Sequence, residues 1–488
     1  MISPYATLEL VTDPASRSAS WGGLPDLGLS ADDLVRATGG RQIKRSTRIA
    51  LGGAVDSREV VAGNLFVALP GERTDGHRFV EAAIAKGAAA VLVSQPVDPS
   101  VLDGADVTVV EVADTLRAFG AVAADWRSRF DPLVVGVTGS IAKTSTKEAI
   151  ATVLASQMPT LKNEGNKNNE IGLPVTLLRL RPDHRAAVLE MGMYVGGEIA
   201  DLARIARPEI GVVTAVQPVH LSRIGTIEAV ERAKGELVEA LPPDGVAILN
   251  ADDERVRRMA SRTTAQVVTY GFAADAEIRA DDVESAGADG MRFTIVARGK
   301  RRSVTIPTLG RMAVHNALAA TAVGLVSGIS IEHVAVALGT GWSAPHRATL
   351  VRAGGVTIVD DSYNASPGSV LAALELLAGM TGRRVAVLGE MLELGDGHEA
   401  GHERVGVAAA ATVDWLVVVG TGAAGIARGA RDAGLATDHI VEVEDRAGAL
   451  AEIRGHVRPG DVVLVKASRG IELDLLVDDL QAALAADR

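Results

Sequence analysis

A lysine and a threonine follow a glycine-rich turn in the segment Gly136-Val-Thr-Gly-Ser-Ile-Ala-Lys143-Thr144. An apolar strand pattern at 133–138 precedes the turn, and a helical pattern at 144–155 follows it. In a phosphate-binding loop, backbone N–H groups and the helix N-terminus face the phosphates of a nucleotide, the lysine contacts the β/γ oxygens, and the threonine hydroxyl ligates Mg²⁺. We therefore predict an ATP site made by Gly139, Ser140, Ala142, Lys143, Thr144 and Ser145.

One position departs from the usual pattern of such a loop. Ala142 stands where a glycine usually precedes the lysine. If the loop requires a positive φ at this position, the Cβ of alanine carries a steric penalty. The alternative is a turn without a ligand, whose hydroxyl side chains cap the helix, but a helix cap has no need of Lys143.

The composition restricts the metals and the partners. The 488 residues include no cysteine, so a metal must be held by oxygen or imidazole ligands, which suit Mg²⁺ or Mn²⁺. The formal charge of −12 argues against nucleic-acid binding, although a few basic side chains in a cleft can still bind a small anion. The first residues show no signal-peptide pattern, and no apolar run reaches 18 residues. We expect a cytoplasmic protein without membrane insertion.

Short β-branched runs alternate with helical patterns along the chain, which predicts an α/β fold with parallel sheets. The expected strands are 133–138, 186–191, 210–216, 246–250, 356–360, 385–389, 416–420 and 462–466, and the expected helices include 144–155, 227–240, 369–378 and 402–412. The runs at 291–297 and 302–307 favour an antiparallel hairpin. At roughly 100–200 residues per domain, the length predicts three domains, which we place at 1–130, 131–343 and 344–488.

Further motifs are spread over the three blocks. They are DSREVVAGNLFVALPGERTDGHRFVEAAIAKGA at 56–88, NEGNKNNEIGLPVTLL at 163–178, EMG at 190–192, HLSRIGTIEAVERAKGEL at 220–237, NALAA at 316–320, HR at 346–347, DDSYNASP at 360–367, VLGEMLELG at 387–395 and VKASRG at 465–470. In this order, from about Leu29 to the C-terminus, the sequence resembles the Mur ligases, ATP-dependent amide-forming enzymes of peptidoglycan synthesis. The NNEIG and VLGEMLELG runs make it most similar to the MurF type, and the D-N-P-R-type motif of the sister type is missing.

This resemblance implies a fold and a reaction. The fold has an N-terminal domain that binds the UDP-sugar, a central P-loop ATPase domain with a parallel sheet, and a C-terminal dinucleotide-fold-like domain that closes over the site. The reaction transfers the γ-phosphoryl of ATP to the terminal carboxylate of UDP-N-acetylmuramoyl-tripeptide, and the amine of D-alanyl-D-alanine attacks the acyl phosphate. Because both reacting partners are anionic, Mg²⁺ and Lys or Arg side chains are needed at the site. We expect a monomer.

The resemblance also implies roles for residues of the central and C-terminal blocks. Glu190 ends a predicted strand, where open α/β sheets place ligand residues, and matches a magnesium ligand. His220 matches a histidine near a second metal, and Lys234 matches a lysine carried as a carbamate. The alternatives are a packed or solvated loop histidine and a solvated surface lysine. Contacts to adenine, the γ-phosphate and the ribose are implied for Asn316, Arg347 and Asp361, respectively.

Substrate-binding roles follow from the same resemblance. They fall to Ser57 and Arg58 for the uridine diphosphate, to Asn166 and Asn169 for the muramoyl-peptide, and to Lys466, Ser468 and Arg469 for the dipeptide or the peptide carboxylate. The alternative for the DSR segment is a surface turn, and the alternative for Asp360-Asp361 is an Asx turn. A second departure from the family is Met312-Ala313, which replaces His-Asn ahead of NALAA.

Two other functions remain open at this stage. One is a related ligase with the same ATPase core, of the polyglutamate or cyanophycin type, which has no need of the segment at 56–88. The other is a nucleotide-binding protein without catalysis, which Ala142 makes conceivable. The evidence against it is the retention of Lys143, Thr144, Glu190, His220, Lys234 and Arg347. Whether the third residue of the tripeptide is lysine or diaminopimelate does not follow from the sequence.

Overall fold

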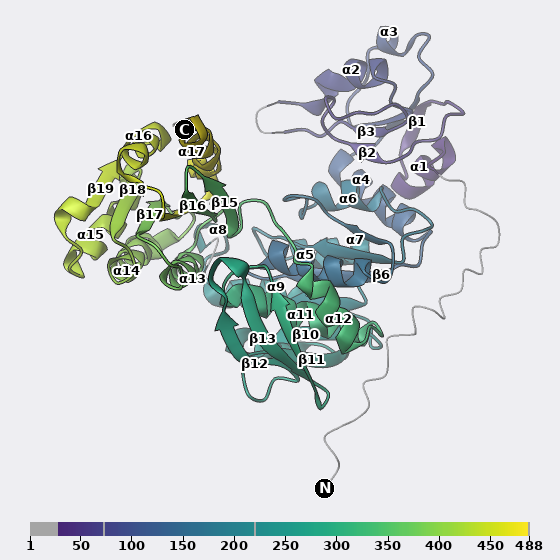
Figure 1. Cartoon of the computed structure of the whole chain (residues 1–488). Coiled ribbons are helices and arrows are strands. Elements are labelled where there is room, and N and C mark those ends of the chain that lie inside the picture. Colours follow the sequence, from purple (N-terminus) through teal and green to yellow (C-terminus); the bar gives the residue numbers. More distant parts are fainter. Residues whose placement is uncertain (1–27, 72–73, 219–220, 487–488) are drawn as a thin grey trace.

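The structure is a computed structural model that describes residues 28–71, 74–218 and 221–486. It contains three α/β domains, each built around one sheet (Figure 1). The predicted fold class is therefore confirmed. In the described ranges, no helix has the length and the apolar character needed to cross a membrane.

The first domain has a five-stranded sheet in the order β1-β5-β4-β3-β2. Its strands are β1 (Arg41–Lys44), β2 (Gly53–Ala54), β3 (Leu65–Val67), β4 (Ala90–Val93) and β5 (Thr108–Glu111), and its helices are α1 (Ala31–Thr38), α2 (Val80–Ala85), α3 (Pro99–Leu102) and α4 (Thr115–Arg127). Only the β1–β5 pair of this sheet is antiparallel. Every residue of β3 and β4 is buried, as expected for parallel strands covered on both faces.

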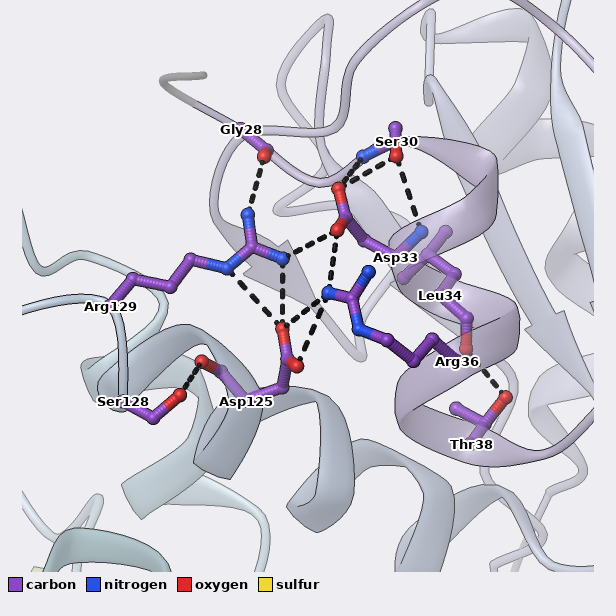
Figure 2. Close-up of polar contacts among 9 residues, drawn as sticks. All are labelled: Gly28, Ser30, Asp33, Leu34, Arg36, Thr38, Asp125, Ser128 and Arg129. Atoms are coloured by element: carbon purple, nitrogen blue, oxygen red, sulfur yellow. Dashed lines mark hydrogen bonds and ion pairs between the residues drawn. The ribbon is translucent and has the colours of Figure 1, made fainter. Parts of the chain in front are cut away.

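An ion-pair network holds α1 against α4 (Figure 2). Ser30 and Asp33 form a capping box at the start of α1. Arg129 contacts the carboxylates of Asp33 at 2.9 Å and of Asp125 at 2.8 Å, and Arg36 contacts the same two groups. Burial of the Asp33 carboxyl opposes its ionisation, but hydrogen bonds from Ser30 and Arg36 and the charge of Arg129 outweigh burial and lower its pKa to about 2.

The central domain has a nine-stranded sheet in the order β14-β13-β12-β11-β10-β9-β6-β8-β7. Its strands are β6 (Leu133–Thr138), β7 (Thr160–Lys162), β8 (Ala186–Glu190), β9 (Ile210–Val213), β10 (Val246–Asn250), β11 (Gln266–Gly271), β12 (Ile278–Ser285), β13 (Met291–Ala297) and β14 (Lys300–Ile306). Strands β12 to β14 pair antiparallel, which confirms the predicted hairpin, and all other pairs are parallel.

The helices of the central domain are α5 (Lys143–Ala155), α6 (Gly172–Leu177), α7 (Glu198–Ala206), α8 (Leu221–Ile224), α9 (Ile227–Glu239), α10 (Glu254–Arg258), α11 (Arg311–Val326) and α12 (Ile331–Gly339). Helices α5 and α11 pack on one face of the sheet in a core of their own. The core on the other face includes Ile205 of α7 and Leu237 of α9, and it continues into the first domain through Phe119 and Trp126 of α4. The first two domains thus share one apolar core.

The third domain has a six-stranded sheet in the order β15-β16-β20-β17-β18-β19. Its strands are β15 (Thr349–Ala353), β16 (Val356–Asp360), β17 (Arg384–Gly389), β18 (Trp415–Val419), β19 (Ile440–Val443) and β20 (Val462–Lys466), and its helices are α13 (Pro367–Ala378), α14 (His398–Ala410), α15 (Ala424–Asp432), α16 (Arg446–His456) and α17 (Leu473–Ala486). Separate cores fill the two faces of this sheet. Figure 1 shows this domain, coloured light green to yellow, beside the central domain and joined to it by a linker.

Candidate active site

The predicted phosphate loop lies between β6 and α5. Gly139 has φ +150°, and a Cβ at this position would lie 1.9 Å from Thr214 Oγ1, so only glycine fits. Ala142 has φ +63° and precedes the first residue of α5. The loop therefore does require a positive φ at this position, and the Cβ of the alanine carries the steric penalty that the sequence analysis predicted for that case. Among the described residues, no side chain caps this helix terminus, which leaves its N–H groups available to an anion.

The loop is fastened to the segment that follows β9. Ser140 donates its backbone N–H to Ala215 O at 2.7 Å and exchanges hydrogen bonds with Gln217. Thr214 Oγ1 donates to Ile141 O at 2.6 Å. These contacts all come from the segment 214–217, and they hold the loop through protein groups alone.

The Lys143 ammonium lies over the loop and donates to Gly139 O at 2.8 Å. Burial lowers the pKa of Lys143, and the nearby Glu190 carboxylate partly opposes that shift. Thr144 and Ser145 form the next part of the same wall.

A cavity of about 880 Å³ opens between the central and C-terminal domains. It brings together most of the residues that the sequence singled out: Ser140, Ala142, Lys143, Thr144, Ser145 and Asn316 from the central domain, and Arg347, Asp361, Lys466, Ser468 and Arg469 from the C-terminal domain. The cavity therefore combines a phosphate loop with basic side chains from a second domain.

Glu190 ends β8 and is buried beside the loop. Asn168 Nδ2 donates to its Oε1 atom at 2.7 Å, and Asn163 exchanges hydrogen bonds with its backbone. Among the described residues, no group donates a hydrogen bond to the buried Oε2 atom. An unpaired buried carboxylate oxygen is costly, and a divalent cation would relieve that cost. Glu190 thus fits a magnesium ligand, although no three His, Cys, Asp or Glu side chains of the described ranges converge on one point.

Lys234 projects from α9 and is only 2% exposed, so the alternative of a solvated surface lysine is wrong. Burial, followed by the charge of Lys143, lowers the pKa of Lys234 well below its ordinary value. A neutral amine is a nucleophile and can react with CO₂. The predicted metal ligand His220 lies outside the described residues.

Asn316 lies near the start of α11, where its Oδ1 accepts a hydrogen bond from Thr146 Oγ1 at 2.9 Å. Met312, one turn earlier on the same helix, and His315, the residue directly before Asn316, also line the cavity. The His315 ring contacts Asp252, which follows β10. This wall of the cavity thus contains both Asn316 and the substituted pair Met312-Ala313.

Arg347 enters the cavity from a strained linker. Its neighbours His346 and Ala348 have φ values of +58° and +51°. His346 contacts Asp360, the last residue of β16, and Ala348 donates its backbone N–H to Asp361. The Arg347 guanidinium lies 4.4 Å from the centre of the Tyr363 ring, and the Arg469 guanidinium lies 5.5 Å from the same centre. Attraction to the ring holds two like charges near each other.

The predicted ribose ligand Asp361 forms an ion pair with Lys466 at 2.6 Å. Its neighbour Asp360 accepts hydrogen bonds from the backbone N–H and the hydroxyl of Ser362, so the Asx-turn alternative describes Asp360. Ser468 Oγ accepts a hydrogen bond from the backbone N–H of Leu392.

Four predicted substrate residues lie away from this cavity wall. Ser57 and Arg58 belong to the first domain, where Arg58 is exposed and forms an ion pair with Asp56. Asn166 is exposed, and the side-chain oxygen of Asn169 accepts hydrogen bonds from the first N–H groups of α6.

Sequence reasoning missed several residues of the site. Asn163 and Asn168, rather than Asn169, contact Glu190. The Tyr363 ring contacts both predicted arginines, and the signal for it was its place inside the quoted DDSYNASP segment. His315 directly precedes the predicted Asn316, but its partner Asp252 is far away in the sequence.

Three profiles of known families match this chain in order: "Mur ligase family, catalytic domain" over 53–127, "Mur ligase middle domain" over 137–324 and "Mur ligase, glutamate ligase domain" over 346–469. A protein of Mycobacterium tuberculosis named UDP-N-acetylmuramoyl-tripeptide--D-alanyl-D-alanine ligase is 40% identical, with 88% of this chain and 91% of that protein covered. The chain belongs to the Mur ligase family.

Solved structures agree in fold with this Mur ligase. A crystal structure of MurF from Acinetobacter baumannii matches with a TM-score of 0.83 and 30% identity, covering 93% of this chain and 99% of that one. The structure of the MurF ligase from Thermotoga maritima in complex with ADP matches with a TM-score of 0.79 and 27% identity, covering 90% and 99%.

Proposed function

We propose that this Mur ligase joins D-alanyl-D-alanine to UDP-N-acetylmuramoyl-tripeptide at the expense of ATP, as a step in the synthesis of peptidoglycan precursors. The carrying observation is the single cavity in which a phosphate loop of one domain faces Arg347, Lys466 and Arg469 of another. The names of the similar proteins support the choice of substrates. They also favour this reaction over that of a polyglutamate ligase.

The loop and Lys143 would bind the triphosphate, with Arg347 reaching the γ-phosphate from the opposite wall. The tripeptide carboxylate then attacks the γ-phosphorus, ADP leaves, and the acyl phosphate reacts with the amine of the dipeptide, releasing phosphate. Lys143 and the two arginines supply positive charge where the transferred phosphoryl group carries negative charge.

Magnesium fits the unpaired oxygen of Glu190, and Thr144 would complete that site from the loop. When bound, Mg²⁺ neutralises charge on the phosphate oxygens. We place a carbamate on Lys234, because burial lowers its pKa and so favours the neutral amine, which is the form that reacts with CO₂, and the carbamate would add a second anionic ligand. His220 is the proposed histidine near the second metal.

The remaining roles are proposals of the same kind. Asn316 would contact the adenine and Asp361 the ribose, while Lys466, Ser468 and Arg469 would orient the dipeptide or the peptide carboxylate. Ser57 and Arg58 would bind the uridine diphosphate, with Asn166 and Asn169 toward the muramoyl-peptide. We propose domains at 1–130, 131–343 and 344–488, and a cytoplasmic monomer.

The test is to incubate the purified protein with ATP, Mg²⁺, D-alanyl-D-alanine and each UDP-N-acetylmuramoyl-tripeptide, carrying either lysine or diaminopimelate. The mass of the UDP-linked product should increase by one dipeptide residue with at least one tripeptide, together with release of phosphate. The Lys143→Ala variant should give no product. Absence of product with both tripeptides, or extension by glutamate instead, would overturn the proposal.

A further inference from the structure

His315 is held rigidly at the wall of the cavity. Its Nε2 atom lies 2.7 Å from Asp252 Oδ2, and its ring makes edge contacts with Tyr270 and Phe272 at centroid distances of 5.5 and 5.1 Å. The side chain is 13% exposed. The ring is therefore fixed on one edge by an acid and on its sides by aromatic residues.

The surroundings of Asp252 determine which nitrogen of His315 carries the proton. Asp252 also accepts hydrogen bonds from the backbone N–H groups of Phe272 and Ala273, both at 2.7 Å. Burial disfavours the charged form of Asp252, but these hydrogen bonds and the one from His315 prevail and lower its pKa. An ionised carboxylate can only accept, so Nε2 of His315 donates its proton to it.

With its proton on Nε2, a neutral imidazole has its acceptor at Nδ1. Within the described residues, Nδ1 has no hydrogen-bonding partner. His315 lines the main cavity and a second hollow of about 350 Å³ behind it, and Ala142, Asn316 and Met312 also line both. His315 thus lines the same space as the phosphate loop and α11, and Nδ1 is its nitrogen without a partner in the described ranges.

The loop residue Ala142 and His315 line the same two hollows, so we place the base of a nucleotide bound at the loop in this space. The flat guanidinium of Arg311, which stacks on the Phe272 ring at 4.3 Å, lines the cavity near His315 and offers a surface for a planar ring. Purines with an amino group at C6 present a donor, whereas purines with a carbonyl there present an acceptor. A fixed acceptor in the wall distinguishes these two classes.

We propose that His315 selects the base of the nucleotide, with its Nδ1 atom accepting a hydrogen bond from the exocyclic amino group of adenine. This inference rests on the proposed function, because it requires a triphosphate at the loop. A 6-oxo purine would bring its own acceptor against Nδ1 and leave both groups unpaired, which costs more than the mere absence of the amino group.

The experiment compares three nucleotides by isothermal titration calorimetry in the presence of Mg²⁺: ATP, purine riboside triphosphate, which lacks the amino group, and ITP, which has a carbonyl in its place. Wild-type protein should bind ATP about fivefold to tenfold more tightly than purine riboside triphosphate, and should discriminate against ITP more strongly. In His315→Ala, both ratios should fall to within about twofold, with the affinity for purine riboside triphosphate little changed.

Two further variants sharpen the comparison. His315→Phe keeps the aromatic contacts and removes both nitrogens, so it should lose the discrimination as His315→Ala does. Met312→Ala changes a side chain one turn away that lines the same two hollows, and it should keep the wild-type ratios. Retention of the ratios in both His315 variants would overturn this inference while leaving the ligase proposal intact. Failure of the wild-type protein to bind any of the three nucleotides would overturn both.

Discussion

Replacing Ala142 by glycine tests whether the phosphate loop is formed before the nucleotide arrives. Ala142 has φ +63°, and the left-handed region costs a residue with a Cβ about 1–2 kcal/mol relative to its ordinary conformation. Glycine removes that cost but loses about 0.4–1 kcal/mol through the greater freedom of the unfolded chain. The net gain in folding free energy is therefore about 0–1.5 kcal/mol, which is a rise in Tm of up to about 5 °C for a domain of this size.

The contacts of the loop determine what glycine does to ATP binding. Ile141 O and Ser140 are hydrogen-bonded to the segment after β9, and Ala142 O accepts from Thr146 N at 2.8 Å. Because these bonds already fix the left-handed conformation, the strain is present in the free and the bound enzyme alike. We expect the KM for ATP of Ala142→Gly to stay within about threefold of wild type, since a contribution common to both states does not alter affinity.

Ala142→Val is the complementary variant, because valine increases the strain at this position whereas glycine removes it. A β-branched residue at positive φ is a strong conformational outlier, and a cost of about 2 kcal/mol above alanine would weaken ATP binding about 30-fold if the loop leaves this conformation. Differential scanning fluorimetry and steady-state KM values for the three proteins measure both effects. A more than tenfold lower KM in Ala142→Gly would refute the reasoning, because it would show that the loop adopts the strained conformation only when ATP binds.

Three other perturbations probe separate parts of the site. Lys234→Ala should abolish product formation, and added short-chain carboxylates should restore a measurable part of the activity because they replace the carbamate. Lack of rescue, or an unmodified Lys234 amine in a crystal structure of the wild-type protein, would contradict the carbamate. Tyr363→Leu should lower kcat about threefold to thirtyfold by removing the ring that holds Arg347, whereas Tyr363→Phe should stay within about twofold; equal losses would exclude the stacking role. Asp33 has a folded pKa of about 2 against an ordinary 3.8, so its stabilisation is present above pH 4 and is lost as the pH falls toward 2. Asp33→Asn should therefore lower the free energy of unfolding by about 1–2 kcal/mol at pH 7. Denaturant titrations should show the difference between variant and wild type becoming smaller below pH 4. A difference that does not change with pH would show that the charge of Asp33 is not responsible.

The sequence predicted the regular elements of the sheets well because buried parallel strands are continuous apolar runs. The strands β6, β10, β16 and β20 have the predicted bounds. The ends of other elements were predicted less well. Strand β9 ends at Val213 instead of the predicted Val216, because the residues after Val213 contact the phosphate loop. Helix α14 begins at His398 instead of the predicted His402. Hydrogen bonds between segments decide such ends, and local patterns do not contain them.

Some residues of the candidate site could likewise be predicted from local sequence, and others could not. Lys143, Glu190 and Lys466 follow from motifs at the ends of strands, where the topology itself brings side chains together. The roles of Asn163, Asn168 and Asp252 depend on contacts over 22 to 63 residues of sequence, which no local spacing reveals. The burial of Lys234 is likewise a property of packing between α9 and the sheet.

The central claim is that the loop from Gly139 to Ser145 binds the triphosphate. Calorimetry tests it most directly, by titrating ATP with Mg²⁺ into the protein saturated with UDP-N-acetylmuramoyl-tripeptide. We predict saturable binding at one site per chain, weakened at least about tenfold in Lys143→Ala because a charge-assisted contact is lost. Lys300→Ala, a change of equal charge on the exposed hairpin, should bind as wild type does. Equal affinity of the wild-type and Lys143→Ala proteins, or no uptake of ATP by either, would contradict the claim.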